Sequence, residues 1–197
     1  MGYQWRWAAP GNAGDLGAAL QYCNHSSVAP YASTVVAKIA DDVRLGRAFV
    51  FPRETAGRTP GLRVSPLGVT VSPSKIRIIH DLIFSTPAPG VNTDTDFSSA
   101  PDCKLGRTLR DKIWRILHLR RPSAPLTRIL LSKMGLKDAF RQISVEWFHC
   151  PVFGYAFHDL VIVDRRLQFG WRNSPGFWCM FSAALEHSHV NTYVTTR

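Results

Sequence analysis

The chain has 197 residues, with 24 Lys or Arg against 14 Asp or Glu, so its formal net charge is +10 at pH 7 with His neutral. Hydrophobic residues make up 45% of it, which excludes a wholly disordered protein. No run approaches the roughly 20 apolar residues that span a bilayer, and the N-terminus lacks the features of a secretory signal. We therefore expect a basic, intracellular α/β protein whose partner is a polyanion rather than a membrane.

The cysteines are too far apart in the sequence to suggest a metal site. None of them lies in a CxxC motif or at zinc-ligand spacing from a histidine. In the absence of a secretory signal, a disulfide framework is not expected either. The sequence predicts reduced thiols at Cys23, Cys103, Cys150 and Cys179.

The N-terminal part begins with an irregular leader over residues 1–32, rich in Gly, Ala, Ser and Asn, with one short helix over 15–22. Apolar residues then recur at helical spacing between Ser33, the expected N-cap, and Gly46, the expected left-handed residue after the helix. Residues 47–51 read as a strand that Pro52 ends.

A β-hairpin follows a loop predicted over residues 53–61. Its two strand-like runs are 64–71 and 76–79, separated by turn-forming residues. Residues 85–103 are mostly polar, with Pro and Gly, and predict a long connector.

The clearest helix of the sequence covers residues 107–121, with an apolar stripe at Leu109, Ile113, Ile116 and Leu117. From position 104 to position 121 there are seven Lys or Arg and one acidic residue, so the segment carries a net charge of +6. These cations form either a solvated helix face or a surface that follows phosphates. The nucleic-acid-binding candidates are Arg107, Arg110, Lys112, Arg115, Arg120 and Arg121.

The C-terminal part alternates short strands and helices. We expect a strand over 126–134, a short turn or helix over 136–143, paired strands over 153–157 and 160–163, and a helix from 176 to about 189.

Three segments, in this order, resemble the motifs of reverse transcriptases. Residues 63–69 with 75–82 are similar to the fingers hairpin, and residues 133–143 (KMGLKDAFRQI) to the first palm motif. Residues 167–175 (LQFGWRNSP) are similar to the following palm motif, usually Pro-Phe-Gly-x-x-x-x-Pro. The resemblance covers about residues 34–190 and points to a retrotransposon polymerase.

The resemblance implies an α+β right-hand polymerase fold, with a fingers hairpin and a truncated antiparallel palm sheet packed with helices. Residues 33–124 would form the fingers-like region with the basic connecting helix, and residues 125–197 a partial palm. The activity of the family is RNA-templated DNA synthesis, a nucleotidyl transfer that uses Mg²⁺.

The resemblance also implies which residues hold a nucleotide triphosphate. Arg77 matches the family's phosphate-gripping Arg, and Lys75 is the nearest candidate for its Lys partner; both could instead be ordinary exposed charges. Backbone amides around Asp138 and Ala139 would cradle phosphate oxygens.

The remaining implied contacts are aromatic. Phe140 matches the family's steric gate, which excludes a ribose 2′-OH by bulk; alternatively it belongs to the core. Phe169 and Gly170 match the segment on which the new base pair packs, where glycine permits close backbone approach.

Two departures from the family pattern concern catalysis. Gly135 stands where the first palm motif has its metal-binding Asp, and glycine has no carboxylate for Mg²⁺. The sequence also has no Asp-Asp pair after position 42, so the family's aromatic-x-Asp-Asp hairpin is missing. We expect this chain to hold no metal and to be inactive as a polymerase.

The expected partners follow from these features. The chain would bind an RNA template or an RNA–DNA hybrid weakly, bind deoxynucleotides weakly or not at all, and could be part of a longer polyprotein. The alternative is a stand-alone basic nucleic-acid-binding module without catalysis, with Trp114 among the cations of residues 107–121.

His80 and Asp81 are adjacent, as in half of a catalytic dyad. Because neighbouring residues of a strand point to opposite faces, we expect no hydrogen bond between their side chains.

Overall fold

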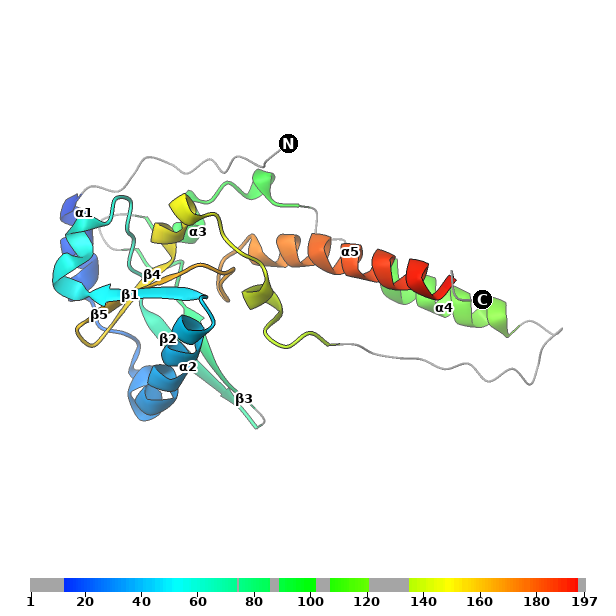
Figure 1. The fold of residues 1–197 in the computed structure, drawn as a ribbon, viewed down its shortest axis with the longest axis horizontal. Coiled ribbons are helices and arrows are strands. Elements are labelled where there is room, and N and C mark those ends of the chain that lie inside the picture. The colour runs from blue at the N-terminus through cyan, green and yellow to red at the C-terminus, as the bar shows by residue number, and fades with distance from the viewer. Residues whose placement is uncertain (1–12, 74, 86–88, 102–106, 121–134, 195–197) are drawn as a thin grey trace. The chain divides into compact units, whose positions relative to one another are not determined.

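The chain divides into two units, each described here by itself. In this computed structural model the described residues are 13–73, 75–85, 89–101, 107–120 and 135–194 (Figure 1). The first unit consists of residues 1–100 with 138–174, and the second of residues 101–137 with 175–197. The described elements are mixed α and β, with two small antiparallel sheets.

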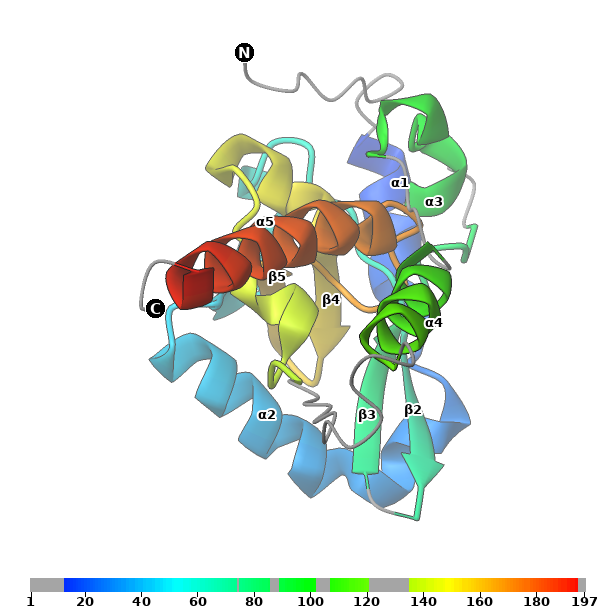
Figure 2. The ribbon, with the colours of Figure 1, turned by 90° about the vertical axis from the view of Figure 1, so that its right-hand side faces the viewer.

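A three-stranded sheet lies in the first unit. Its order is β1 (Ala48–Pro52), β5 (Leu160–Asp164), β4 (Gly154–Phe157), and both pairings are antiparallel (Figure 1). Figure 2 shows β4 and β5 side by side. β4 and β5 form the predicted pair, and the turn between them has His158 in a left-handed conformation, with φ 52°. The sheet therefore takes strands from both sides of position 125, the expected boundary between fingers and palm.

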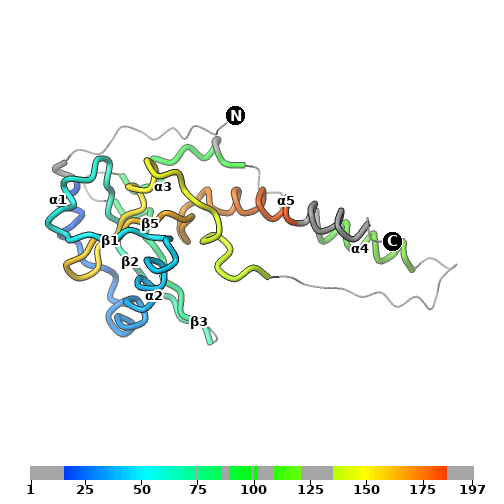
Figure 3. The backbone as a smooth tube through the Cα atoms, viewed as in Figure 1, coloured from blue at the N-terminus to red at the C-terminus, as the bar shows by residue number. Residues whose placement is uncertain are grey.

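The second sheet is the predicted hairpin of β2 (Leu67–Ser72) and β3 (Lys75–His80). Its tip points away from the three-stranded sheet (Figure 3). β2 begins three residues later than predicted, because Val64 bridges to Gly154 instead and pairs with the edge of β4.

Helical segments precede β1 in the first unit. α1 (Ala13–Gln21) is followed by a 3₁₀ segment, η1 (Ser26–Tyr31), and by α2 (Ala32–Arg44). α2 is the predicted helix, but Ser33 is not its N-cap: Tyr31 occupies that position without a side-chain cap. α1 confirms the short helix predicted over residues 15–22, whereas η1 forms where the rest of the leader was expected to be irregular.

The main core joins these elements. Val35 of α2, Leu67 of β2 and Ile162 of β5 are fully buried together, and Val28 of η1 and Tyr155 of β4 pack with them. Burial of such side chains stabilises each by about 1.5–3 kcal/mol. The N-terminal segment is therefore part of the core.

Two segments predicted as loops contain short helices. Within 53–61, η2 (Arg53–Arg58) places Ala56 at 0% exposure, in a second apolar cluster. Within 85–103, α3 (Val91–Asp94) and η3 (Phe97–Ser99) form. The strand predicted over 126–134 lies outside the described residues.

The second unit contains the basic helix and the C-terminal helix. α4 (Arg107–Leu119) confirms the predicted helix almost to its bounds. α5 (Ser174–Val194) begins two residues earlier than predicted and continues five residues beyond position 189. Among the described helices, none combines the length and apolar character needed to cross a membrane.

Gly46→Ala is expected to lower the free energy of unfolding by about 1 kcal/mol. Gly46 has φ +62°, a conformation that glycine adopts freely, and a Cβ there would touch nothing within 4 Å, so the cost is conformational alone. Gly57→Ala is the control, because its site is equally open and has no positive φ. Urea denaturation compares the two; equal effects would contradict the left-handed cap.

Candidate functional site

Lys75 and Arg77 lie exposed on β3 of the hairpin. Since residues two apart share a face of a strand, both lie on the same face as Ile79. Across the hairpin, Arg77 is opposite Thr70. Neither cation has an ion-pair partner among the described residues, so both are accessible to an anion.

A pocket of about 310 Å³ opens at the base of this hairpin. Ile79 lines it, which places the pocket on the face of β3 that carries Arg77. Its lining is mostly apolar and includes Gly68, Leu82 and Gly170. A cavity of this size and polarity suits a planar ring system.

His25 and Ser27 line the pocket, and their segment is held against β2. The His25 N–H donates to Leu67 O (2.9 Å), and Asn24 Oδ1 accepts from the Leu67 N–H (2.8 Å). Ser27 Oγ accepts from the Val69 N–H (3.0 Å). Sequence reasoning missed these residues, because Asn, His and Ser are ordinary in loops and their contacts lie more than 40 positions away.

A side-chain contact beside the pocket separates the two members of the suspected dyad. His25 Nε2 lies 3.0 Å from Asp81 Oδ2, whereas His80 Nε2 lies 3.6 Å from Asp164 Oδ2. The structure confirms that His80 and Asp81 turn to different partners.

Gly170 brings the second palm-like motif to the hairpin base. Its φ is +115°, and a Cβ there would lie 2.4 Å from His80 O. Phe169 O accepts from the His80 N–H (3.4 Å), and Gly170 O accepts from Asn92 Nδ2 (2.8 Å). Close backbone approach, rather than chain flexibility alone, requires glycine here.

Phe140 and Phe169 come together from the two palm-like motifs. Their ring centroids are 4.9 Å apart, with the planes inclined by 49°. Phe169 is 51% exposed and Phe140 is half-buried, so neither ring belongs to the closed core. The pair presents a partly exposed aromatic surface on which another ring can pack.

Asp138 precedes the short 3₁₀ segment η4 (Ala139–Gln142), which forms where a short turn or helix was predicted. Asp138 has φ 54° and ψ 45°, in the left-handed region. Its carboxylate lies 3.5 Å from Arg47 Nη1, so the side chain is held by this neighbour.

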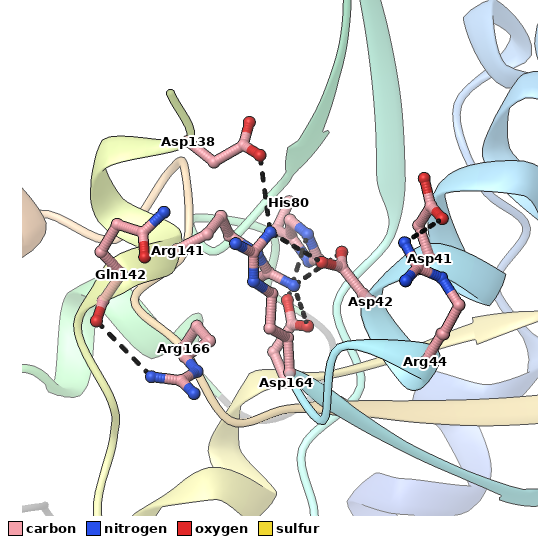
Figure 4. A network of polar contacts seen from close by, with 10 residues as sticks. Asp41, Asp42, Arg44, His80, Asp138, Arg141, Gln142, Asp164 and Arg166 are labelled. Atoms are coloured by element: carbon pink, nitrogen blue, oxygen red, sulfur yellow. Dashed lines mark hydrogen bonds and ion pairs between the residues drawn. The ribbon is translucent and has the colours of Figure 1, made fainter. Parts of the chain in front are cut away.

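A largely buried network of charged side chains has Arg141, the residue after Phe140, at its centre (Figure 4). Arg141 Nη2 donates to Asp42 Oδ2 (2.8 Å) and to Asp164 Oδ1 (2.7 Å). Burial disfavours the guanidinium charge, but Asp164 and Asp42 outweigh burial and raise the pKa of Arg141. Burial also raises the pKa of Asp42, against the opposing effect of Arg141.

His80 borders the same network. Burial lowers its pKa to about 4; the nearby Asp164 opposes this shift and Arg141 adds to it. The ring packs edge-on against Tyr155, with centroids 4.8 Å apart, and its Nδ1 has no hydrogen-bond partner among the described residues. The imidazole is therefore neutral at pH 7.

The second unit holds the remaining candidates. Arg110, Lys112, Arg115 and Arg120 are exposed along or just beyond α4, and Arg110 Nε lies 3.7 Å from Asp111 Oδ1. Arg107 begins the helix, whereas Arg121 lies outside the described residues.

Gly135 is exposed, and a Cβ there would meet nothing within 4 Å. It offers no side-chain oxygen, so its side chain supplies no ligand for Mg²⁺. Across the described parts of the chain, no group of three or more His, Cys, Asp or Glu could hold a metal ion.

Comparison with known proteins gives only distant similarity, and only in structure. No protein-family model matches the chain, and no curated protein matches its sequence. A foamy virus protease-reverse transcriptase, solved in complex with double-stranded DNA, is similar with a TM-score of 0.48 and 16% identity. The match covers 80% of this chain and 23% of that one. A likeness this distant does not assign the chain to a family.

Proposed function

We propose that this chain is a reverse-transcriptase-like fragment of a retroelement that binds nucleic acid at the hairpin base and does not polymerise DNA. One observation carries the proposal: the exposed face of Arg77, the 310 Å³ pocket and the ring pair of Phe140 and Phe169 all lie in the first unit. Arg77 and the two rings belong to the three motif-like segments, and Gly170, which follows Phe169, lines the pocket.

The chemistry of these groups suits a nucleotide unit of a strand. Arg77 offers a planar set of donors to phosphate oxygens, with Lys75 beside it as a second cation. The pocket and the rings offer apolar surface to a base, and base–aromatic stacking contributes about 1–3 kcal/mol per base. The net charge of +10 favours association with any polyanion.

The absence of polymerisation is part of the proposal. Transfer of a nucleotide by two metal ions needs carboxylates to hold them. Gly135 supplies none, and the sequence has no Asp-Asp pair after position 42. Incubation with a primed RNA template, Mg²⁺ and deoxynucleotides is expected to give no extended primer; extension by the unmodified chain would contradict this part.

Arg77→Ala is expected to weaken binding of a labelled RNA–DNA hybrid by about five- to tenfold, since a charge-assisted phosphate contact is lost. The slope of log affinity against log salt should fall by about 1. Fluorescence anisotropy at several salt concentrations measures both.

Arg44→Ala is the matched control. Arg44 is also exposed, but it lies on α2 beside Asp41, away from the pocket lining. It should change affinity by less than about twofold. Equal losses for the two variants, or binding by the parent chain that ignores salt, would overturn the proposed site.

The stand-alone binding module remains the second candidate, supported by α4. This helix exposes Arg110, Lys112 and Arg115, and Trp114 among them is 66% exposed. If α4 alone binds the strand, replacing the three cations with Gln abolishes hybrid binding, while Arg77→Ala leaves it unchanged.

A further inference from the structure

We infer that Asp164 is a positioning residue, which sets the spacing of the Phe140 and Phe169 rings by holding the residue next to each of them. This inference rests on the proposed function, because the ring pair is the surface on which a base would stack. Asp164 ends β5 and is 1% exposed, so its carboxylate does not reach a bound strand itself.

The two oxygens of Asp164 accept from different segments of the chain. Oδ1 accepts from Arg141 Nη2 (2.7 Å), and Oδ2 accepts from Gln168 Nε2 (2.8 Å). Arg141 directly follows Phe140, and Gln168 directly precedes Phe169. One carboxylate therefore ties together the backbone segments that carry the two rings.

Arg141 and Gln168 each donate to a second acceptor as well. Arg141 also donates to Asp42 Oδ2 (2.8 Å), and Gln168 Nε2 also donates to Phe153 O (3.0 Å). Two acceptors for one nitrogen fix which end of the Gln168 amide points at Asp164.

A buried Gln at position 168 has a free-energy cost that an apolar residue would avoid. The residue is 0% exposed, and its Oε1 has no hydrogen-bond partner among the described residues. An apolar side chain of similar length would leave no buried oxygen unsatisfied. The contact of the amide with Asp164 accounts for a polar residue at this position.

The consequence is a preformed stacking surface. Phe169 is half exposed and Phe140 half-buried, so surrounding core does not enclose the pair. Rings that are already fixed lose little conformational entropy when a base packs on them. Release of the Asp164 link lowers the stacking contribution and leaves contacts with phosphate unchanged.

Gln168→Met tests this, because Met has similar length, lacks the amide and removes the unsatisfied oxygen. We expect NMR of the full chain to show cross-relaxation between the Phe140 and Phe169 ring protons in the parent and its loss in the variant. Hybrid affinity should fall about tenfold, while the salt slope stays unchanged because no phosphate contact is lost. If Gln168→Met does not fold, Gln168→Asn replaces it, since its shorter amide cannot reach both acceptors.

Asp42→Asn is the control, because it weakens the other anchor of Arg141 and leaves both Asp164 contacts in place. It should retain the ring contact and the affinity. A Gln168 variant that keeps both, or an Asp42 variant that loses both, overturns the inference. If the parent binds no hybrid, the proposed function fails, and the ring cross-relaxation alone decides whether Asp164 positions the pair.

Discussion

Arg141→Met is expected to lower the free energy of unfolding by about 3–5 kcal/mol, the range for breaking a buried ion pair by removing one partner. Asp164 is 1% exposed and Asp42 mostly buried, and Arg141 is the cation that contacts both at under 3 Å. Met preserves much of the alkyl packing, so the loss reports charge and hydrogen bonds. Asp42 should offset part of this loss of stability, because burial already raises its pKa and so favours its neutral form. Urea denaturation at pH 7 measures the change.

Arg44→Met is the matched control, because Arg44 also pairs with an Asp but does so in solvent. Arg44 Nη2 lies 3.2 Å from Asp41 Oδ1, but the side chains are 70% and 67% exposed (Figure 4). Screened pairs of this kind contribute about 0.5 kcal/mol or less. If the two substitutions cost the same, the network at Arg141 is not the buried structure described above.

Elements with a local periodicity could be predicted from the sequence. The stripe at Leu109 and Ile113 predicted α4, and Gly46 marked the end of α2 correctly. The β2–β3 and β4–β5 hairpins followed from apolar runs on either side of short turns. In each case the information lies within a few residues of the element that it specifies.

The segments that were missed are defined by distant contacts. Ser33 has the chemistry of an N-cap, yet α2 begins earlier because η1 leads directly into it. Asn24 and Ser27 hold β2 through hydrogen bonds across more than 40 positions, which no local pattern reveals. Tertiary packing of Val28 turns an apparently irregular leader into part of the core.

The candidate site likewise contains residues with a local sequence signal and residues without one. Phe140, Phe169 and Gly170 became candidates because a motif pattern includes them, and the structure brings the two rings into contact beside Gly170. Asp164 and Gln168 were not found, since a buried carboxylate leaves no periodic signal. The one available sign is that Asp164 directly continues an apolar strand, where an unpaired charge would be costly.

Acidification from pH 6.5 to pH 4 is expected to remove up to about 3 kcal/mol of stability through His80 alone. Burial lowers the pKa of His80 from 6.5 to about 4 in the folded chain, with Asp164 opposing and Arg141 adding to the shift. In this window the unfolded chain binds a proton that the folded chain does not, so the free energy of unfolding falls as pH falls. More than about one pH unit above 6.5, both states are neutral at this residue, and the contribution no longer changes. Asp42 acts in the opposite direction above its ordinary pKa of 3.8, because its folded-state pKa is raised by burial.

His80→Asn should flatten the dependence of stability on pH between 4 and 6.5, whatever it does to stability at pH 7. His158→Asn is the control: its ring is exposed on the β4–β5 turn, and Asn accepts the left-handed backbone there (φ 52°). Urea midpoints measured at half-unit intervals of pH give both slopes. A parent chain whose stability is level across this window, or a His158 variant that flattens it as much as His80→Asn does, would mean that His80 is not the buried neutral imidazole that borders Asp164.

Protonation of His80 should also affect the aromatic pair. The carboxylate of Asp164 holds Arg141 and Gln168, and a protonated His80 ring would compete with them for it. Loss of the ring contact between Phe140 and Phe169 should therefore accompany the loss of stability on acidification.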